Sequence, residues 1–325
     1  MGMTNLFLKS TGWVYAVAAP RVSASGAGRT SLSPKSIGAV LVAGMCLVNT
    51  ACDASTELYS VKSLYRNISV TEEDGLRCMK FGRNVMARQS CVQLSDHDKL
   101  VFNYTKMMMA SLYLNPDPKH VLIVGLGGGT LPSALQKLFP NARIDVAEID
   151  PAITEVAKKY FFFNPNSKMP VAEEDGRVFV KRALKKKEKY DLVMLDAFDH
   201  EYIPEHMLTK EFLQEVRGLL TDKGVLASNT FSSSKLFNYE SATYYSVFGD
   251  FYRLKSGNRV ILLRMGGLPA MAEINQNAAM IDNRLRVFGT GKDELLPMIA
   301  VESGWPADTK VLTDQYSPSN LLNVQ

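Results

Sequence analysis

Cysteine is scarce in this sequence: only four of the 325 residues are cysteines, and no two of them form a CxxC pair. A zinc knuckle or a dithiol redox centre built on such pairs is therefore not predicted. The state of Cys78 and Cys91 depends on the compartment. In an exported protein they would pair across a hairpin that turns near Gly82, whereas in the cytosol they would be two thiols.

The chain also lacks a strong excess of charge of either sign. Charged residues make up 22% of it, hydrophobic residues 46%, and the formal net charge is +4. This composition is ordinary for a folded globular protein and excludes disorder or a coiled coil for most of the chain. Much of the positive charge lies in residues 181–189. We interpret this run, which has no interleaved aromatic residues, as a solvated helix end rather than a nucleic-acid site.

Long apolar runs are missing too, since no stretch reaches the roughly 20 residues that span a membrane. Residues 1–36 contain basic but no acidic side chains, and a short apolar stretch follows and ends near Cys52. This pattern fits a secretory signal. We therefore expect residues 1–55 to be a leader, with Cys52 as a lipoprotein acylation site and the one means of membrane attachment. The alternative is a disordered tail on a cytoplasmic protein.

Three further regions follow the leader. Residues 56–116 are predicted to form short strands and then a Met-rich helix from Leu100 to Leu114. Residues 117–265 alternate apolar, β-branched runs with helical segments, which predicts a parallel, doubly wound sheet. Residues 266–325 are predicted to be a helical extension. The expected strands of the third region lie at residues 121–124, 142–148, near 171, 190–195 and 224–229, with a closing hairpin over residues 251–263.

A glycine-rich loop between the first predicted strand and helix of the third region is the strongest local signal. Glycines without a Cβ let the backbone approach a ligand, and the following helix presents unpaired amides. The third glycine of the GxGxxG pattern is missing, because Thr130 stands there. A tight turn without a ligand is the alternative. The loop consists of Gly125, Leu126, Gly127, Gly128, Gly129 and Thr130.

Acidic residues follow the next three predicted strands. Glu148 ends the second strand, where a carboxylate can accept both hydroxyls of a ribose, and Asp175 follows the third, where it would meet an adenine amino group or cap a helix. Asp196 and Asp199 follow the fourth strand, with His200 as a rival base. Because ligands of such sheets bind outside the carboxyl ends of the strands, we expect these acids and the glycines to share one crevice.

Residues 121–231 resemble the catalytic domain of the spermidine synthase (polyamine aminopropyltransferase) family, and the strands before them resemble its small N-terminal β region. The matching segments are the glycine loop and residues 89–90, 147–151, 174–176 and 190–199. The resemblance implies an α/β, Rossmann-like fold of the S-adenosylmethionine-dependent methyltransferase type with a small N-terminal β region. It also implies a homodimer.

The resemblance further implies which residues act. The catalytic acids would be Asp196 and Asp199, attracting a small amine acceptor and accepting its proton. The donor would be S-adenosylmethionine or its decarboxylated form, with no metal and no nucleic acid involved. The cofactor-binding residues would be Gln89, Gly125, Gly127, Gly128, Gly129, Thr130, Glu148, Asp150, Asp175 and Gly176.

Two departures from the family leave the reaction open. Thr130 stands where the family has an aspartate for the amine of the decarboxylated donor, and its neutrality removes the repulsion of a donor carboxylate. The residues that hold the acceptor are also poorly matched at Tyr104-Thr105-Lys106 and His200-Glu201. An aminopropyltransferase-like enzyme is the first hypothesis. A methyltransferase and a catalytically inactive nucleoside-binding protein are alternatives, and a dehydrogenase fits less well.

Overall fold

The first strands of the protein form a small antiparallel sheet. The computed structural model describes residues 55–82, 88–197, 204–232 and 235–322, all within the second of two units, Met1–Ala51 and Cys52–Gln325. The leader hypothesis, including Cys52, therefore lies outside the described residues. The strands of the small sheet pair in chain order: β1 (Thr56–Lys62), β2 (Asn67–Glu73), β3 (Leu76–Phe81) and β4 (Arg88–Gln93).

A disulfide joins the last two strands of this sheet. Cys78 on β3 and Cys91 on β4 lie directly opposite each other in the register, and their sulfur atoms are bonded. Both side chains are buried. The pairing expected for an exported protein is thus present, while residues 83–87, which come between the two strands in the sequence, lie outside the described ranges.

Within the described residues, eight strands form the main sheet, in the order β12-β10-β11-β9-β8-β5-β6-β7. Five of them run parallel, and the hairpin of β10 and β11, together with β12, is added antiparallel at one edge. The bounds are β5 (His120–Val124), β6 (Arg143–Glu148), β7 (Val171–Glu173), β8 (Tyr190–Leu195), β9 (Leu220–Thr230), β10 (Tyr252–Ser256), β11 (Asn258–Arg264) and β12 (Ala300–Val301).

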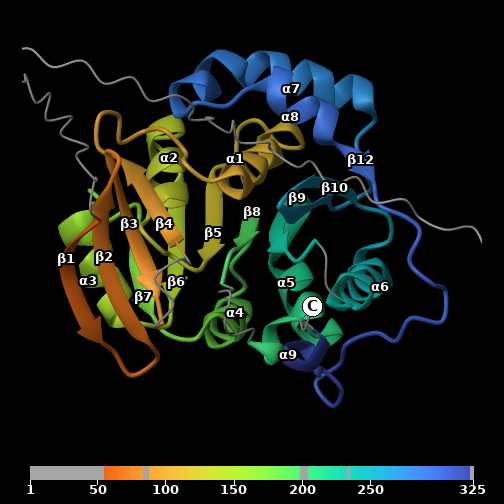
Figure 1. Ribbon diagram of the computed structural model, residues 1–325. Helices are drawn as coiled ribbons and strands as arrows, with labels where there is room; N and C mark the ends of the chain where they lie inside the picture. The colour runs from red at the N-terminus through yellow and green to blue at the C-terminus, as the bar shows by residue number, and fades with distance from the viewer. Residues whose placement is uncertain (1–54, 83–87, 198–203, 233–234, 323–325) are drawn as a thin grey trace, which may run out of the picture. The chain divides into compact units, whose positions relative to one another are not determined.

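Helices cover both faces of this sheet because its central strands are apolar on both sides. On β5, Val121 and Ile123 enter one hydrophobic core, whereas Leu122 and Val124 enter the other. The first core includes α1 (Asn103–Met109), α2 (Thr130–Leu138), α3 (Pro151–Tyr160) and α7 (Met271–Leu285). The second includes α4 (Gly176–Lys185), α5 (Lys210–Leu219) and α6 (Leu236–Phe248). The small sheet contacts α3, since Arg77 on β3 donates to the carbonyl of Tyr160 at 2.8 Å, and Figure 1 shows the two elements at the same side of the molecule.

Two predicted helices differ from the observed ones. The helix expected over residues 100–114 is shorter, because α1 passes into a 3-10 turn, η1 (Ala110–Tyr113). Helix α6 begins earlier than expected. The helix expected from Ser241 starts at Leu236, and the missed residues include the buried acidic residue Glu240, which does not fit an apolar spacing.

The C-terminal region belongs to the same core. Asn277 on α7 donates to the backbone of Tyr113 at 2.9 Å, and β12 pairs with β10. None of the helices in the described ranges has the length and apolarity to cross a membrane. The remaining short elements are η2 (Glu205–Met207), η3 (Arg286–Phe288), α8 (Lys292–Leu295), η4 (Leu296–Met298) and α9 (Ser319–Leu322).

Candidate active site

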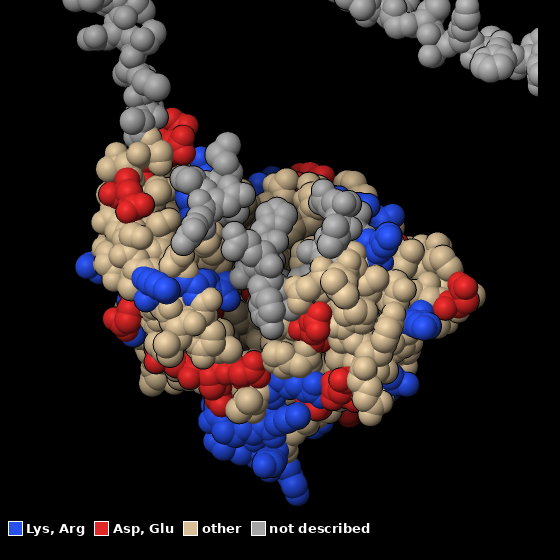
Figure 2. Space-filling view, turned by 60° about the horizontal axis from the view of Figure 1, so that its bottom comes forward, with Lys and Arg blue, Asp and Glu red and all other residues tan. Residues whose placement is uncertain are grey.

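The predicted site residues lie along one edge of the main sheet. Strands β7, β6, β5 and β8 are neighbours and run parallel, so their carboxyl ends meet at this edge. Gly125, Glu148, Asp175 and Asp196 each stand at a strand end or within two residues of one. Figure 2 shows a hollow near the middle of the view, with acidic side chains just below it and the main group of basic side chains farther away.

The glycine loop is shaped by the protein's own packing as well as by backbone conformation. A Cβ at Gly125 would overlap the backbone carbonyl of Asp196, and one at Gly129 would overlap the ring of Phe163. A Cβ at Gly128 would lie 2.7 Å from the hydroxyl of Ser90. Packing alone therefore favours glycine at these three positions. This agrees with the alternative interpretation of the loop, a tight turn without a ligand.

Gly127 differs from these three, because the nearest atom to its missing Cβ is Ser90 Cβ, at 3.6 Å. Its φ of 53° lies in the left-handed region that favours glycine. Ser90 and Gln89 belong to β4, so this strand lies beside the loop. Thr130 is the first residue of α2.

Glu148 is held by two backbone amides. Its carboxylate accepts from Leu126 N and from Asp150 N, each at 3.0 Å, and the side chain is buried. Burial raises the pKa of this carboxyl, while the two amides oppose the shift. Because each oxygen has two lone pairs and uses one here, each can still accept a ribose hydroxyl.

Asp150 connects the site to the small sheet. One oxygen caps α3 by accepting from Ala152 N at 3.0 Å, and the other accepts from the hydroxyl of Ser63 at 2.5 Å. Ser63 lies in the turn between β1 and β2. This carboxylate thus has structural partners on both oxygens, and its contact with a cofactor remains a prediction.

Asp175 is a helix cap, one of the two readings that the sequence allowed. One oxygen accepts from the backbone amides of Arg177 and Val178, and the other contacts His206 Nε2 at 2.9 Å. Its role toward adenine remains a prediction. Gly176 follows directly, and a Cβ there would overlap Val124.

Asp196 lies after β8 in a polar group that the sequence reading did not assemble. Asn229, at the end of β9, donates to its carboxylate at 3.0 Å, and the hydroxyl of Tyr104 on α1 also shares a hydrogen bond with it. Burial raises the pKa of Asp196 to about 7, and both hydrogen bonds oppose that shift. Burial also raises the pKa of Tyr104 well above its usual value, so this phenol keeps its proton.

Asn229 is the residue that sequence reasoning missed. The signal that could have found it is the one that indicates Glu148 and Asp196, a polar residue at the end of a parallel strand, since Asn229 stands near the end of β9, the next parallel strand. Asp199 and His200, the other two candidates, lie outside the described residues.

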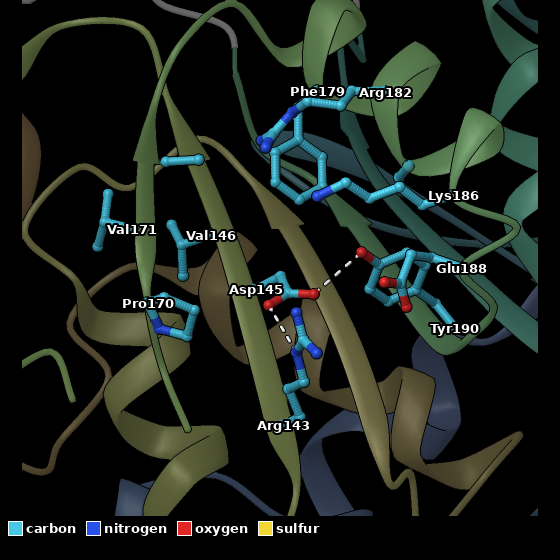
Figure 3. A pocket seen from close by; sticks show the side chains of 12 residues that line it. Arg143, Asp145, Val146, Pro170, Val171, Phe179, Arg182, Lys186, Glu188 and Tyr190 are labelled. Atoms are coloured by element: carbon cyan, nitrogen blue, oxygen red, sulfur yellow. Dashed lines mark hydrogen bonds and ion pairs between the residues drawn. The ribbon is translucent and has the colours of Figure 1, made fainter. Parts of the chain in front are cut away.

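A second hollow lies away from this edge. It has a volume of about 180 Å³ and is lined in part by Arg143 and Asp145 near the amino end of β6, Tyr190 at that of β8, and Phe179 and Arg182 on α4 (Figure 3). Arg143, Tyr190 and His120 all hydrogen-bond to Asp145. None of the predicted site residues lines it. Within the described ranges, no group of three or more Cys, His, Asp and Glu side chains is arranged to hold a metal ion.

Comparisons with known proteins agree with this geometry. Residues 101–250 match the model of the spermine/spermidine synthase domain. A polyamine aminopropyltransferase of Vibrio vulnificus is 43% identical over 299 residues, which are 90% of this chain and 95% of that protein.

Two solved structures share the fold. A spermidine synthase in complex with the transition state analogue AdoDATO aligns with a TM-score of 0.58 and 20% identity, over 76% of this chain and 84% of that one. Human methyltransferase-like protein 13 in complex with SAH aligns with a TM-score of 0.52 and 28% identity, over 66% of this chain and 99% of that one. The S-adenosylmethionine-dependent methyltransferase type of fold expected from the sequence is confirmed.

Proposed function

Because the chain belongs to the spermine/spermidine synthase family, we propose that it transfers an aminopropyl group from decarboxylated S-adenosylmethionine to a small amine. One observation in the site carries the proposal. A carboxylate with a pKa of about 7, that of Asp196, lies at the carboxyl edge of the sheet, where its backbone carbonyl packs against Gly125.

The chemistry requires a proton acceptor. An amine with a pKa near 10 is mostly protonated at neutral pH and cannot attack in that form. The ionised carboxylate of Asp196 would attract the ammonium group and take one proton from it. The free amine nitrogen then forms a bond to the carbon next to the sulfonium, and the carbon–sulfur bond breaks with its electrons staying on sulfur. The products are a lengthened amine, methylthioadenosine and a proton on Asp196.

Binding of the nucleoside is proposed at Glu148 and the glycine loop. The lone pairs that Glu148 keeps support contacts with both ribose hydroxyls, and the backbone at Gly127 has no side chain to obstruct a ligand. Holding the sulfonium carbon in line with an amine at Asp196 would supply a large part of the rate.

A methyltransferase using intact S-adenosylmethionine is the second candidate. The observation that favours it is Thr130, a neutral residue at the start of α2 where the spermidine synthase resemblance predicts an aspartate. A neutral side chain does not repel the carboxylate of the intact donor. The likeness to human methyltransferase-like protein 13 agrees with this alternative.

We also propose that the protein is exported. A homodimer, which the family resemblance implies, is a separate proposal. The Cys78–Cys91 disulfide supports export, since such bonds persist mainly outside the reducing cytosol. Cell fractionation followed by N-terminal sequencing tests it: removal of the residues up to Ala51 supports a processed leader, and an intact N-terminus in the cytosolic fraction contradicts it.

Calorimetry and product analysis test the reaction. The purified protein is titrated with decarboxylated S-adenosylmethionine, the intact form and methylthioadenosine, and then incubated with putrescine and each donor. Preference for the decarboxylated donor with formation of a lengthened amine supports the proposal. Binding of the intact form alone supports a methyltransferase. Nucleoside binding without turnover of either donor points to an inactive binding protein, and no binding contradicts all three.

A further inference from the structure

The turn between β10 and β11 contacts two elements that carry partners of Asp196, β9 and α1, and also the segment that follows β9. Asn258 donates to the side-chain oxygen of Asn229 at 3.0 Å, and Asn103, at the start of α1, donates to the hydroxyl of Ser256 at 3.1 Å. Ser232, just after β9, donates to the carbonyl of Gly257. Gly257 has a φ of 76°, which lets the chain reverse between two paired residues. The tip of this hairpin is thus joined to β9 and to the helix that carries Tyr104.

The hydrogen bonds at Asn229 have a fixed direction. An ionised carboxylate can only accept, so the NH₂ group of Asn229 must face Asp196. The side-chain oxygen of Asn229 is then left to face Asn258, which donates its own NH₂ group. If Asn258 did not donate, the amide of Asn229 could rotate whenever Asp196 is protonated and accept from its O–H group, which would favour the neutral acid.

We propose that Asn258, an exposed residue on the hairpin tip, positions the catalytic carboxylate by fixing the amide orientation of Asn229. Ser256 assists by holding the start of α1, and with it Tyr104. This inference rests on the proposed role of Asp196 as the proton acceptor. The hairpin of β10 and β11, which follows the strand-end motifs of the family in the sequence, would thus contribute to the reaction.

The arrangement sets the charge state of Asp196. Burial favours the neutral acid, while the donors on Asn229 and Tyr104 favour the carboxylate. These two side chains come from β9 and α1, and the hairpin tip contributes the neutral side chains of Ser256 and Asn258. Loss of the Asn229 donor would therefore raise the pKa of Asp196, by about one unit or more for a hydrogen bond to a charged group.

The test follows the protonation of Asp196 directly and needs no substrate. Protein labelled with ¹³C at the aspartate carboxyl groups is titrated by NMR, and the Asp196 signal is assigned by its loss in Asp196→Asn. Asn229→Ala and Asn258→Ala are both expected to raise the midpoint, the first by about one unit or more. Turnover at pH 7 would fall about fivefold or more in Asn229→Ala and recover near pH 9, with a smaller change in KM.

A double variant shows whether Asn258 acts through Asn229. If it does, Asn229→Ala combined with Asn258→Ala has the same midpoint as Asn229→Ala alone. Asn277→Ala is the matched control, because it removes an asparagine hydrogen bond elsewhere in the core. It should lower stability and leave the midpoint unchanged.

Two results overturn the proposal: a folded Asn258→Ala protein with the wild-type midpoint, or additive shifts in the double variant. Neither result depends on aminopropyl transfer. Absence of turnover with every donor would instead contradict the proposed function, even if the midpoints shift as expected.

Discussion

The hydroxyl of Tyr104 on α1 shares a hydrogen bond with the carboxylate of Asp196 after β8. The two residues are far apart in the sequence and meet because α1 packs on the sheet near β9 and β11. A neutral phenol and a carboxylate that titrates near neutral pH form the pair. The pH dependence of turnover should report this carboxylate.

Turnover is expected to rise with pH through about pH 7. The pKa of Asp196 is raised to about 7, so its base form grows from about one tenth at pH 6 to about nine tenths at pH 8. Initial rates measured across this range at saturating donor should show an ascending limb. Tyr104→Phe removes one donor to the carboxylate and should move that limb to higher pH. A limb that stays in place would exclude Tyr104 from this effect.

Asp196→Asn is expected to abolish turnover, with a loss of about a hundredfold or more, because an amide cannot accept the proton. Donor binding measured by calorimetry should survive. Asp250→Asn, an exposed aspartate on the loop before β10, is the control and should keep full activity. Retained turnover in Asp196→Asn would remove this residue from its role.

The same substitution should also change stability in a pH-dependent way. The pKa of Asp196 is higher in the folded protein than in the unfolded chain, so the folded state binds the proton more tightly between about pH 4 and pH 7. Ionised Asp196 therefore destabilises the fold above pH 7. Asp196→Asn should raise the free energy of unfolding at pH 8 by on the order of 1 kcal/mol and have less effect at pH 5.

Glu148→Gln is expected to weaken nucleoside binding about tenfold or more. The glutamine NH₂ group would face a backbone amide donor, of Leu126 or Asp150, in a buried place where the carboxylate now accepts from both. Calorimetry with methylthioadenosine measures the loss. Glu173→Gln is the matched control, because Glu173 is exposed and pairs in register with Glu148. Equal affinity in both variants would argue against a ribose contact at Glu148.

Reduction of the disulfide is expected to destabilise the protein by about 3 kcal/mol. The bond joins residues 13 positions apart, and a loop of this size loses that much chain entropy in the unfolded state. Denaturant unfolding with and without a thiol reductant measures the difference in the wild type. In Cys78→Ala combined with Cys91→Ala, the reductant should have no effect. A wild-type curve that is insensitive to reductant would contradict this expectation.

Much of the fold could be predicted because its signals are local. The buried run Val121 to Val124 marks β5 whatever surrounds it, and Glu148 and Asp196 are recognisable as residues that end parallel strands. Because the carboxyl ends of parallel strands share one edge of the sheet, the sequence predicts that these residues lie close together.

The remaining features depend on contacts that sequence spacing does not reveal. Ser63 meets Asp150 across 87 positions, and Asn103 meets Ser256 across 153. The role of the Asn229 amide depends on its hydrogen bonds to Asp196 and Asn258, which come from other parts of the sheet. A polar residue at a strand end can be noted in the sequence, but its partner is fixed by the packing of the whole sheet.

Arg177 shows how such a distant contact can be tested. All five N–H groups of its guanidinium are used: they donate to both oxygens of Glu215, to both oxygens of Asp314 and to the carbonyl of His206, at 2.7 to 3.0 Å. Arg177 thereby holds the segment around Asp314 against α4 and α5. It also lowers the pKa of Asp314 to about 2.

Replacing Arg177 should therefore release the C-terminal segment. Arg177→Ala leaves two carboxylates without their buried partner and is expected to cost about 3 kcal/mol in the free energy of unfolding. Cleavage near residues 312–322 should become faster in limited proteolysis. Arg182→Ala removes an exposed ion pair with Glu174 from the same helix and should cost less than about 1 kcal/mol.

Because the Asp314 carboxylate is stabilised only while ionised, the wild-type contact should weaken as the pH falls from about 4 towards 2, and the difference between wild type and Arg177→Ala should shrink with it. A difference that stays constant over that range would mean that Arg177 stabilises the protein by packing rather than by charge.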